Sequence, residues 1–463
     1  MSEQELRSLA QKHGQGHIFQ WWDELDKDKR ARLLEQVRTV DFDLVDEFRR
    51  TIVQERKPLG TLLPSVPTPL PGPIERVEAV GWEALARGEV AAVVVAGGQG
   101  TRLGYDRPKG MYPLSPIRRA SLFQIFAESV LARARFGAVP HWIIVVSDAT
   151  DAQTQEFFAE NRFFGLPRER VHFIKQGNNP SVDLQGRLIL KSKYELAFNP
   201  DGHGGCAKAI GKQLDLIRSL GVKYLYWFQV DNPIARILDP AFVGAHILHG
   251  AEFSAKALRK RDAAEKLGMF IHEDGRLKVI EYTELPRERQ EETLPDGSLR
   301  FGLGNISIFV IGVELLERVC RPRFLLPVHA SPKPIPYIGA RGELVQPGRD
   351  PQTGKEKVTG YKFEYFTFDS IMYASKVLLM ETSREAEFAP VKNRNEDGQD
   401  TPNTARAAMM ALHRQWLREA GFAVSDDAVV EISPLYAMSA AELAARLAPG
   451  TKLSFPLLLA PER

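Results

Sequence analysis

One stretch of the sequence decides the fold: Ala91-Ala92-Val93-Val94-Val95-Ala96-Gly97-Gly98-Gln99-Gly100-Thr101-Arg102-Leu103-Gly104, followed by Pro108-Lys109-Gly110. Its first half is an unbroken apolar run rich in valine, which predicts a buried strand. Its second half is rich in glycines, which let backbone N–H groups come close to phosphate oxygens because they carry no Cβ atom. Arg102 and Lys109 add the positive charge that a polyphosphate requires. The stretch therefore predicts a strand that ends in a phosphate-binding loop.

Three other interpretations of this loop compete with the first. A dinucleotide-binding fingerprint needs Gly-x-Gly-x-x-Gly at the start of a helix, but here Gly104 comes one position late and Pro108 follows soon after. A Walker A loop needs Gly-Lys-Ser/Thr, where this chain has Pro108-Lys109-Gly110. A purely structural turn would not need this group of glycines together with two basic residues. The pattern therefore favours a nucleoside triphosphate loop of neither common class.

From Val90 onward the sequence alternates between strand-like and helix-like segments. Buried strands separated by helices are typical of a mainly parallel sheet with helices on both faces, so the predicted fold class is α/β. The predicted strands are Val90–Ala96, Trp142–Ser147, Val171–Lys175, Tyr224–Val230, Lys278–Tyr282 and Ile306–Ile311. The predicted helices are Leu122–Arg135, Thr154–Asn161, Ala207–Leu220 and Val313–Val319.

The two ends of the chain differ from this central part. Apolar residues at helical spacing among many charges predict helices up to about Val53. The segment from Pro58 to Pro73 holds too many prolines for a helix or a central strand, so we expect an extended crossing segment. Another helix is predicted over Ala405–Ala420. We expect a helical N-terminal domain with the proline-rich segment at 1–88, a catalytic domain at 89–398 and a small C-terminal domain at 399–463.

Composition narrows the class of protein. The chain has 463 residues, with 61 Lys and Arg against 59 Asp and Glu and a formal net charge of +2, which argues against nucleic-acid or membrane partners bound through bulk electrostatics. The polar start lacks the apolar core of a signal peptide, and no apolar run reaches the roughly 18–20 residues that span a bilayer. Two cysteines, Cys206 and Cys320, are too few for a disulfide framework. We therefore expect a cytoplasmic protein with neither nucleic-acid nor membrane partners.

Further short motifs follow the glycine loop in a fixed order. They are Phe163-Phe164-Gly165-Leu166, Gln176-Gly177, Pro200-Asp201-Gly202-His203-Gly204-Gly205, Val230-Asp231-Asn232, Val279-Ile280-Glu281-Tyr282, Gly304-Asn305-Ile306, Ile335-Pro336-Tyr337, Phe366-Thr367-Phe368-Asp369, Glu387-Phe388-Ala389-Pro390-Val391-Lys392-Asn393 and Glu431-Ile432-Ser433-Pro434-Leu435. Together with the loop they resemble the sugar-nucleotide pyrophosphorylases, and most of all the eukaryotic-type UDP-N-acetylglucosamine pyrophosphorylases. The resemblance covers nearly all of the chain from about Ala91 onward.

The resemblance implies a fold and a reaction. The fold is a Rossmann-like (GT-A-like) nucleotidyltransferase domain between an N-terminal and a C-terminal domain. The reaction joins UTP and a sugar 1-phosphate, with Mg²⁺, to give a UDP-sugar and pyrophosphate without a covalent enzyme intermediate. The residues agree with that last point, because the sequence has no Gly-x-Ser-x-Gly elbow and no evident Cys/His nucleophile pattern. The expected oligomeric state is a monomer or a homodimer.

The resemblance also implies which residues handle the phosphates. Asp231 is matched to the Mg²⁺ ligand, and it follows the predicted strand Tyr224–Val230, where α/β folds place ligands. A plain turn residue is the alternative, because Asn232-Pro233 is itself a turn signal. Arg102, Lys109 and Lys392 are matched to the phosphate-neutralising residues; the alternative for Arg102 is a residue that braces the loop, and the alternative for Lys392 is a solvated surface lysine. The loop residues matched to uridine and phosphate contacts are Val95, Ala96, Gly97 and Gly98.

The remaining matched residues concern the base and the sugar. Gln176 is matched to the uracil-reading glutamine, since an amide offers a donor and an acceptor together, and Gly202 to a second contact with the base. Gly268, Glu281 and Asn305 are matched to the sugar pocket, with a hairpin at Asp274-Gly275 between the first two. Phe366 and Phe368 alternate as strand neighbours do, which predicts both rings on one face, either in the sugar pocket or in the core.

One residue departs from the family pattern. Where the N-acetylglucosamine enzymes usually have asparagine, this chain has His203, as the glucose 1-phosphate branch does. We therefore expect N-acetylglucosamine 1-phosphate as the substrate and keep glucose 1-phosphate, or a broad range of sugars, as the alternative. Two other classes of protein compete with the enzyme: a non-catalytic UDP-sugar-binding protein, and an NAD-type oxidoreductase suggested by the glycines alone.

Overall fold

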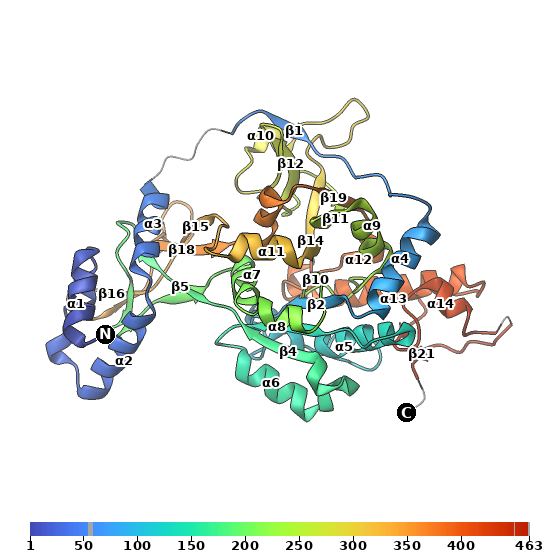
Figure 1. Ribbon diagram of the computed structural model, residues 1–463, viewed down its shortest axis with the longest axis horizontal. Helices are drawn as coiled ribbons and strands as arrows, with labels where there is room; N and C mark the ends of the chain where they lie inside the picture. The colour runs from blue at the N-terminus through green and yellow to red at the C-terminus, as the bar shows by residue number, and fades with distance from the viewer. Residues whose placement is uncertain (54–58, 449, 462–463) are drawn as a thin grey trace. The chain divides into compact units, whose positions relative to one another are not determined.

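The computed structural model describes residues 1–53, 59–448 and 450–461 (Figure 1). The chain forms two compact units, each made of several sequence segments. The first unit comprises residues 1–58, 176–208 and 325–367, and the second comprises 59–175, 209–324 and 368–463. The division of the chain at residues 88 and 398 stays a prediction.

The second unit is built on a ten-stranded sheet with the order β1-β12-β14-β10-β2-β3-β4, to which β11, β13 and β19 are added. Its α/β character confirms the predicted fold class. The strands are β1 (Leu62–Pro64), β2 (Val90–Val95), β3 (Trp142–Val146), β4 (Val171–Lys175), β10 (Tyr224–Gln229), β11 (Phe253–Arg259), β12 (Met269–Glu273), β13 (Arg276–Ile280), β14 (Leu303–Gly312) and β19 (Val377–Glu381). The helices are α4 (Ile74–Ala86), α5 (Leu122–Arg133), α6 (Asp151–Glu160), α8 (Leu214–Ser219), α9 (Pro240–His249), α10 (Arg287–Gln290), α11 (Val313–Cys320), α12 (Arg384–Glu387), α13 (Pro402–Glu419) and α14 (Ala440–Ala444).

Strand direction divides this sheet into two parts. Strands β10, β2, β3 and β4 are parallel, as predicted. In contrast, β14 runs antiparallel to β10, β11 and β12, so the prediction of a mainly parallel sheet is wrong for this part. The reason is local for β12 and β13, because a two-residue turn connects only antiparallel strands. That turn is the predicted hairpin, with φ of 51° at Asp274 and 78° at Gly275.

The core of the second unit forms around β2. Each residue from Val90 to Val94 is fully buried, so both faces of this strand are covered. Aromatic pairs join the neighbouring β10 to the helices: the rings of Phe126 (α5) and Phe228 lie 5.2 Å apart, and those of Tyr226 and Phe242 (α9) lie 5.9 Å apart. This packing holds the ends of β2 and β10 rigidly in place.

Most predicted elements differ in their bounds by a few residues, and for two of them the difference changes the interpretation. The helix predicted over Ala207–Leu220 is two helices, α7 (His203–Gly211) and α8, which begins at Leu214. The strand predicted over Lys278–Tyr282 begins at Arg276 and ends at Ile280, so Glu281 follows the strand instead of lying within it.

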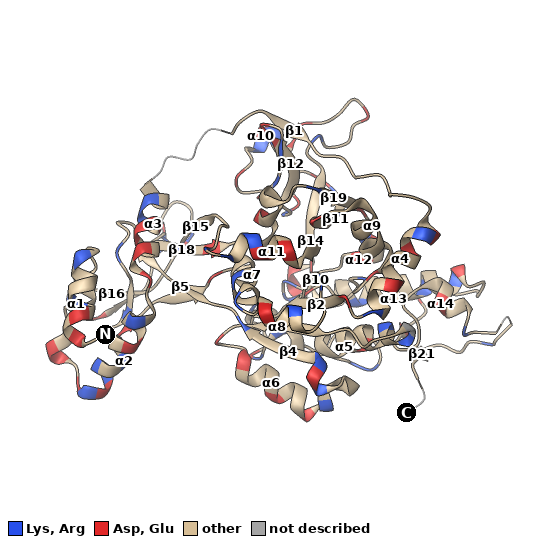
Figure 2. Ribbon diagram, viewed as in Figure 1, with Lys and Arg blue, Asp and Glu red and all other residues tan. Residues whose placement is uncertain are grey.

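The first unit combines three N-terminal helices with small sheets (Figure 1). The helices are α1 (Glu3–Lys12), α2 (Lys27–Thr39) and α3 (Phe42–Val53), in agreement with the helices predicted for this part of the chain, and residues 54–58 lie outside the described residues. The rings of Phe48 in α3 and Phe363 in β18 are stacked, with centroids 3.8 Å apart. Figure 2 shows both signs of charge along α1 and α2. The strands are β5 (Asn178–Pro180), β6 (Val182–Asp183), β7 (Leu190–Ser192), β8 (Glu195–Leu196), β9 (Phe198–Pro200), β15 (Val328–Lys333), β16 (Tyr337–Ile338), β17 (Leu344–Val345) and β18 (Gly360–Tyr365).

The proline-rich segment is extended from Leu59 onward, as predicted, whereas Pro58 lies outside the described residues. Its strand β1 pairs with β12 at the edge of the large sheet, where Pro64 costs no central hydrogen bond. Further along, the backbone N–H of Thr68 donates to the carbonyl of Leu379 at 2.7 Å. Across all the described residues, no helix has the length and apolarity needed to cross a lipid bilayer.

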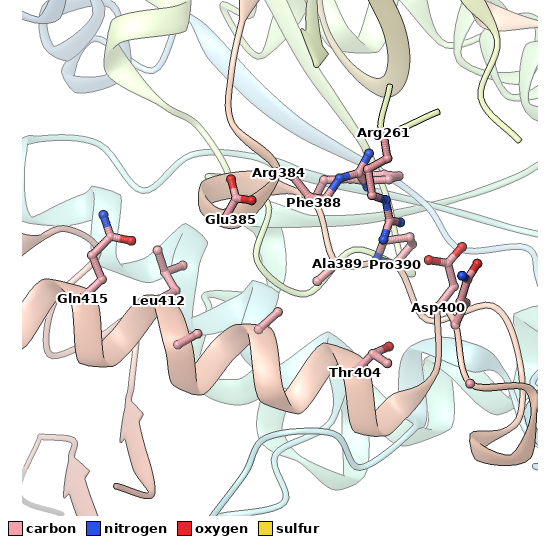
Figure 3. A pocket seen from close by; sticks show the side chains of 14 residues that line it. Arg261, Arg384, Glu385, Phe388, Ala389, Pro390, Asp400, Thr404, Leu412 and Gln415 are labelled. Atoms are coloured by element: carbon pink, nitrogen blue, oxygen red, sulfur yellow. The ribbon is translucent and has the colours of Figure 1, made fainter. Parts of the chain in front are cut away.

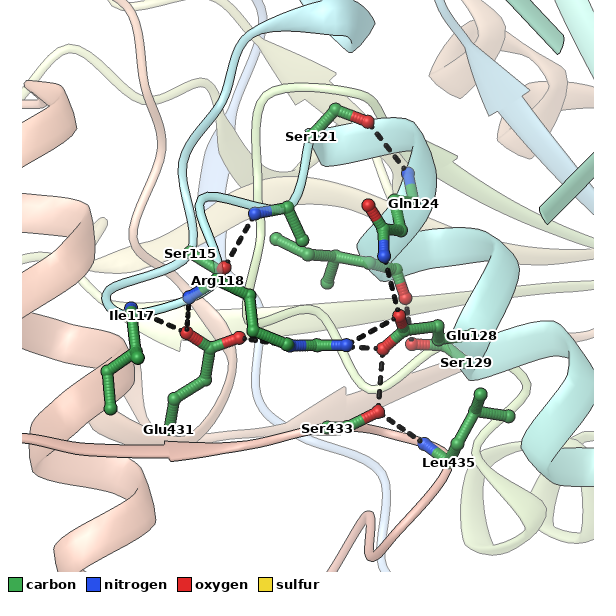
Figure 4. A network of polar contacts seen from close by, with 12 residues as sticks. Ser115, Ile117, Arg118, Ser121, Gln124, Glu128, Ser129, Glu431, Ser433 and Leu435 are labelled. Carbon is green, nitrogen blue, oxygen red and sulfur yellow. Dashed lines mark hydrogen bonds and ion pairs between the residues drawn. The ribbon is translucent and has the colours of Figure 1, made fainter. Parts of the chain in front are cut away.

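Two elements complete the C-terminal part of the second unit, β20 (Val430–Ile432) and β21 (Leu457–Leu459), which form a parallel pair. Figure 4 shows how this part joins the segment that follows the glycine loop. The Arg118 side chain donates to both oxygens of Glu128, at 2.8 and 2.9 Å, and to Glu431 at 2.7 Å. Ser433 donates to Glu128 at 2.7 Å. Although burial opposes its ionisation, hydrogen bonds from Arg118 and Ile117 keep the pKa of Glu431 below its usual value.

Candidate active site

The glycine loop begins where β2 ends, at Val95. The Ala96 N–H donates to Val145 of β3 at 2.8 Å, which fixes the start of the loop. Gly97 follows, and its carbonyl accepts a hydrogen bond from Ser147 Oγ at 2.8 Å. A Cβ atom on Gly98 would meet no atom within 4 Å, so this exposed glycine leaves open space beside the backbone. The loop therefore combines a fixed entry with an accessible backbone, which suits contacts to phosphate oxygens.

Two other glycines of the loop, Gly100 and Gly104, allow its backbone conformation. A Cβ on Gly100 would lie 2.7 Å from the carbonyl oxygen of Tyr105, which only glycine avoids. Gly104 has a φ of 71° and ends the short 3-10 helix that carries the exposed Arg102. A Cβ on Gly104 would lie 3.6 Å from Nε of Arg394. Arg394 is thus a further cation beside the loop that the motif comparison missed, although it lies only two residues after the matched Lys392.

Lys109 lies between the loop and a distant segment of the chain. Its ammonium group donates to the carbonyl of Val391 at 3.2 Å and lies 3.8 Å from Oδ2 of Asp231. Lys392 follows Val391 directly, and its ammonium lies 5.8 Å from the centroid of the Phe388 ring. The structure therefore brings together Lys109, Asp231 and the backbone that carries Lys392, while Arg102 lies on the exposed side of the loop.

Asp231 lies just beyond the carboxyl end of β10, next to the end of β2. Its carbonyl accepts the N–H of Val391 at 2.8 Å. The turn that the sequence offered as the alternative is also present, because Asp231 and Pro233 both lie in turns. Both interpretations are thus compatible: the backbone forms a turn, and the carboxylate faces Lys109.

The residues around Asp231 fit a magnesium ion. Mg²⁺ accepts hard oxygen ligands and is commonly held by one or two carboxylates together with substrate phosphates. The Asp231 side chain is 20% exposed, so its carboxylate is accessible to such an ion. Within the described residues, the one group of three potential ligands within 4.8 Å of one another is His13, Asp43 and Asp46. A metal at Asp231 would therefore depend on the substrate for most of its ligands.

Three residues matched to the sugar pocket lie next to one another. The N–H of Asn305 donates to the carbonyl of Gly268 at 2.8 Å. A Cβ on Gly268 would lie 3.0 Å from Oε1 of Glu281, so glycine leaves room beside this carboxylate. Asn305 Oδ1 accepts the N–H of Ser307, whose φ of 56° accompanies a shift in register between β14 and β11. Such an irregularity re-aims a side chain, which explains the position of Asn305 in an otherwise regular strand.

The first unit carries the residues matched to the base. Gln176 is buried, and its Oε1 accepts a hydrogen bond from Cys206 at 3.3 Å. Gly202 has a φ of 82°, and a Cβ there would lie 2.6 Å from the carbonyl oxygen of Tyr365. Only glycine therefore fits at this position. These side chains are uncharged, in contrast to the charged groups around Asp231.

His203 begins α7 in the same unit. Its Nδ1 accepts a hydrogen bond from the N–H of Thr367 at 3.0 Å, so a neutral ring carries its proton on Nε2. Burial and the neighbouring His329 lower the pKa of His203 to about 4, which keeps the ring neutral at pH 7. The ring also stacks on Phe366 at 5.2 Å, and Phe366 lies 4.3 Å from His329.

The prediction that Phe366 and Phe368 share one face of a strand is wrong. Strand β18 ends at Tyr365, and a 3-10 helix over Thr367–Tyr373 follows. Hydrogen bonds between Thr367 and His203 end the strand: Thr367 Oγ1 donates to the His203 carbonyl at 2.6 Å. Phe368 is 3% exposed and belongs to the buried core.

A separate cavity of about 390 Å³ lies beside α13 (Figure 3). Ala408, Ala411 and Leu412 of the helix line it together with Arg384 and Phe388. None of the residues matched to the family's site lines this cavity. Phe388, Ala389 and Pro390 of the segment that carries Lys392 do line it, so the cavity adjoins that segment.

Comparisons with known proteins agree with this geometry. A sequence model described as UTP–glucose-1-phosphate uridylyltransferase matches residues 77–440. UDP-N-acetylhexosamine pyrophosphorylase-like protein 1 of Xenopus tropicalis is 34% identical, over 99% of this chain and 96% of its own length. UDP-N-acetylglucosamine pyrophosphorylase of Saccharomyces cerevisiae is 33% identical, over 93% of this chain and 94% of its own.

A solved structure shows the same fold along the whole chain. It is the uridine diphosphate N-acetylglucosamine pyrophosphorylase of Trypanosoma brucei, in complex with an inhibitor. Its TM-score is 0.84 at 27% identity, with 100% of this chain and 99% of that chain covered. The resemblance drawn from the motifs is confirmed, and the chain belongs to the UTP–glucose-1-phosphate uridylyltransferase family.

Proposed function

We propose that this chain is a uridylyltransferase that converts UTP and N-acetylglucosamine 1-phosphate into UDP-N-acetylglucosamine and pyrophosphate. The observation that carries the proposal is the cluster at the ends of β2 and β10, where Lys109 lies 3.8 Å from Asp231 beside an accessible glycine loop. Family membership and the names of relatives that match nearly the whole chain support the same reaction.

The proposed chemistry is a single in-line displacement. A phosphate oxygen of the sugar 1-phosphate forms a bond to the α-phosphorus of UTP, and the bond from that phosphorus to the bridging oxygen breaks, releasing pyrophosphate. Both reactants are anions, so the enzyme contributes mainly positioning and charge neutralisation. Lys109, Arg102 and Lys392 would supply the positive charge, and Val95, Ala96, Gly97 and Gly98 would hold the nucleotide through the backbone.

We further propose that Asp231 holds Mg²⁺ during the reaction. The ion would neutralise charge on the phosphates when bound. The Lys109 ammonium, 3.8 Å from Oδ2 of Asp231, would add positive charge beside the same phosphates. For the base, Gln176 and Gly202 are the proposed contacts in the first unit. For the sugar, the proposed contacts are Gly268, Glu281, Asn305, His203 and Phe366.

The identity of the sugar is the finer part of the proposal. Relatives named for N-acetylhexosamine or N-acetylglucosamine match 87–99% of the chain and favour N-acetylglucosamine 1-phosphate. Glucose 1-phosphate is the second candidate, because His203 replaces the asparagine that we expect in N-acetylglucosamine enzymes.

The test is pyrophosphate release with UTP and Mg²⁺ across a panel of sugar 1-phosphates. We expect the highest kcat/KM with N-acetylglucosamine 1-phosphate. A preference for glucose 1-phosphate would overturn the choice of sugar alone. No release with any sugar, together with UDP-sugar binding that persists in Lys109→Ala, would instead identify a non-catalytic binding protein.

Two properties of the whole protein complete the proposal. The two cysteines are both free thiols, Cys206 buried and Cys320 partly exposed, which suits the reducing cytoplasm. A monomer or homodimer is the proposed assembly, and light scattering coupled to gel filtration measures it directly.

A further inference from the structure

Lys256 is a buried lysine in the same unit as Lys109 and Asp231, which together are called the phosphate-handling group below. Lys256 lies in β11, and its side chain is 1% exposed. Its ammonium donates to Oδ2 of Asp239 at 2.7 Å and to both carboxylate oxygens of Glu387, at 2.5 and 2.7 Å. Glu387 also accepts a hydrogen bond from Thr382 at 3.2 Å. A fully buried lysine is rare unless it is paired, and here two carboxylates surround it.

Both carboxylates of this triad are held in place. Burial opposes the ionisation of Asp239, but Lys256, Arg236 and Arg133 keep its pKa well below its usual value. Asp239 also accepts the N–H of Ala241 in the first turn of α9. The triad of Lys256, Asp239 and Glu387 therefore fixes Glu387 relative to β11 and α9.

Glu387 begins the segment that reaches the phosphate-handling group. Its carbonyl accepts a hydrogen bond from Nδ2 of Asn232 at 2.7 Å, and Oδ1 of Asn232 accepts the N–H of Ala389 at 3.1 Å. Val391 then donates its N–H to Asp231 at 2.8 Å and accepts from Lys109 at 3.2 Å. Lys256 is thus connected to the two groups proposed to handle metal and phosphate through its hydrogen bonds to Glu387, the backbone of residues 387–391, and the hydrogen bonds of Val391.

We propose that Lys256 is a positioning residue for uridylyl transfer, acting through Glu387 and the segment 387–392 on Asp231 and Lys109. The inference rests on the proposed function. It assigns a role to Lys256, which lies outside every motif matched to the family. Because displacement of a reacting group by about 1 Å can cost on the order of 100-fold in rate, loss of this support should lower kcat strongly.

The variant that tests this is Lys256→Met combined with Glu387→Gln. It removes one positive and one negative charge at nearly constant volume, which is often neutral for stability, whereas Lys256→Met alone leaves two buried carboxylates facing each other. Arg236, 3.5 Å from Asp239, still balances the remaining carboxylate. We expect a folded protein with kcat lowered by about 10- to 100-fold and KM for UTP changed by less than about threefold.

A matched control lies in the same strand. Ser254 is fully buried in β11, and its hydroxyl pairs with Nδ1 of His246 at 2.7 Å. Ser254→Ala removes a buried hydrogen bond without touching the segment 387–392. We expect its kcat to stay within about twofold of wild type even if its thermal midpoint falls.

A readout without turnover separates this inference from the proposed function. Amide hydrogen exchange over residues 387–392 should be faster in the double variant than in wild type and unchanged in Ser254→Ala. If wild type releases no pyrophosphate, the proposed function is wrong. Hydrogen exchange alone then tests whether Lys256 holds the segment 387–392 in place. Unchanged exchange, or a kcat within twofold of wild type in the folded double variant, overturns the inference.

Asn232→Ala provides the second test if the double variant does not fold. It removes both hydrogen bonds to Glu387 and Ala389 and leaves the buried triad intact. A lower kcat with faster exchange over 387–392 supports the inference, and wild-type values for both overturn it.

Discussion

The side chains of Lys109 and Asp231 differ in charge from those of Gln176 and His203. In the second unit, Lys109 and Asp231 carry opposite charges and remain partly exposed, at 15% and 20%. In the first unit, Gln176 is buried and uncharged, and His203 is neutral at pH 7 because burial and His329 lower its pKa to about 4. Under the proposed function, Lys109 and Asp231 would meet the phosphates and their metal ion, and Gln176 would offer hydrogen bonds to the base.

This difference separates two tasks of a nucleotidyltransferase. Charge that develops during phosphoryl transfer is stabilised by charged groups, which act on kcat. A base is selected by neutral donors and acceptors, which act on binding. We therefore expect substitutions in the two groups to affect different kinetic constants, and the predictions below test that division.

Lys109→Ala should have the largest effect. Loss of the ammonium group removes about 3–4 kcal/mol of transition-state stabilisation, on the order of 100- to 1,000-fold in kcat, with a smaller change in KM for UTP. Steady-state pyrophosphate release measures both constants. Lys223→Ala is the control, because Lys223 precedes β10 at its opposite end and pairs with Glu89 at the surface. An equal loss in both variants would contradict the role of Lys109.

Asp231→Asn should come next. The amide is a weaker ligand for Mg²⁺ than the carboxylate, so we expect kcat to fall by about 100-fold and half-maximal activity to need at least about tenfold more Mg²⁺. Removal of the metal with EDTA should abolish activity in wild type. Asp215→Asn, at an exposed ion pair with Arg321, serves as the control. A wild-type Mg²⁺ titration in Asp231→Asn would exclude this carboxylate as the ligand.

Gln176→Leu should act on nucleotide binding. The loss of a buried hydrogen-bonding amide costs about 1–3 kcal/mol, or roughly 5- to 150-fold, chiefly as a higher KM for UTP. Gln185→Leu, in an exposed loop of the same unit, should change neither constant. If Gln176→Leu lowered kcat alone, it would contradict the expectation that the charged group acts on kcat and the uncharged group on KM for UTP.

His203→Asn should change the choice of sugar. We expect the ratio of kcat/KM for N-acetylglucosamine 1-phosphate to that for glucose 1-phosphate to shift by about tenfold, the effect of one or two altered contacts. Parallel assays with the two sugar phosphates give this ratio. An unchanged ratio would mean that His203 does not contribute to the choice of sugar.

The pH dependence of stability should show the smallest effect. The folded protein keeps His203 neutral down to about pH 4, whereas the unfolded chain binds a proton near pH 6.5. The unfolded state therefore takes up more protons in this window, and stability falls as the pH is lowered through it. Between pH 7 and 5 the free energy of unfolding should fall by about 2 kcal/mol less in His203→Asn than in wild type, as measured by urea denaturation. Equal losses would mean that His203 titrates normally.

Local sequence patterns predicted the central strands and several neighbouring site residues. The run before Gly97 is fully apolar, and the run before Asp231 is apolar except for Gln229, so burial indicates where each strand lies. The hairpin at Asp274-Gly275 follows from two residues that tolerate positive φ, and it places Glu281 beside Gly268.

The features that were not predicted depend on contacts distant in sequence. Phe366 leaves its strand because Thr367 bonds to His203, 164 residues earlier, and no local pattern contains that information. Lys256 pairs with Glu387, which lies 131 residues later in the sequence. The sequence does carry one signal for a buried ion pair, because Lys256 is the single charged residue in the otherwise uncharged run Phe253–Leu258. The antiparallel part of the sheet likewise depends on which strands meet, which alternation alone does not specify.

The most direct test of the division between the two groups is one set of steady-state measurements on wild type, Lys109→Ala and Gln176→Leu, with UTP, N-acetylglucosamine 1-phosphate and Mg²⁺. We expect turnover in wild type, a loss confined mainly to kcat in Lys109→Ala and a loss confined mainly to KM for UTP in Gln176→Leu. The same pattern of loss in both variants, or no pyrophosphate release by wild type, would contradict it.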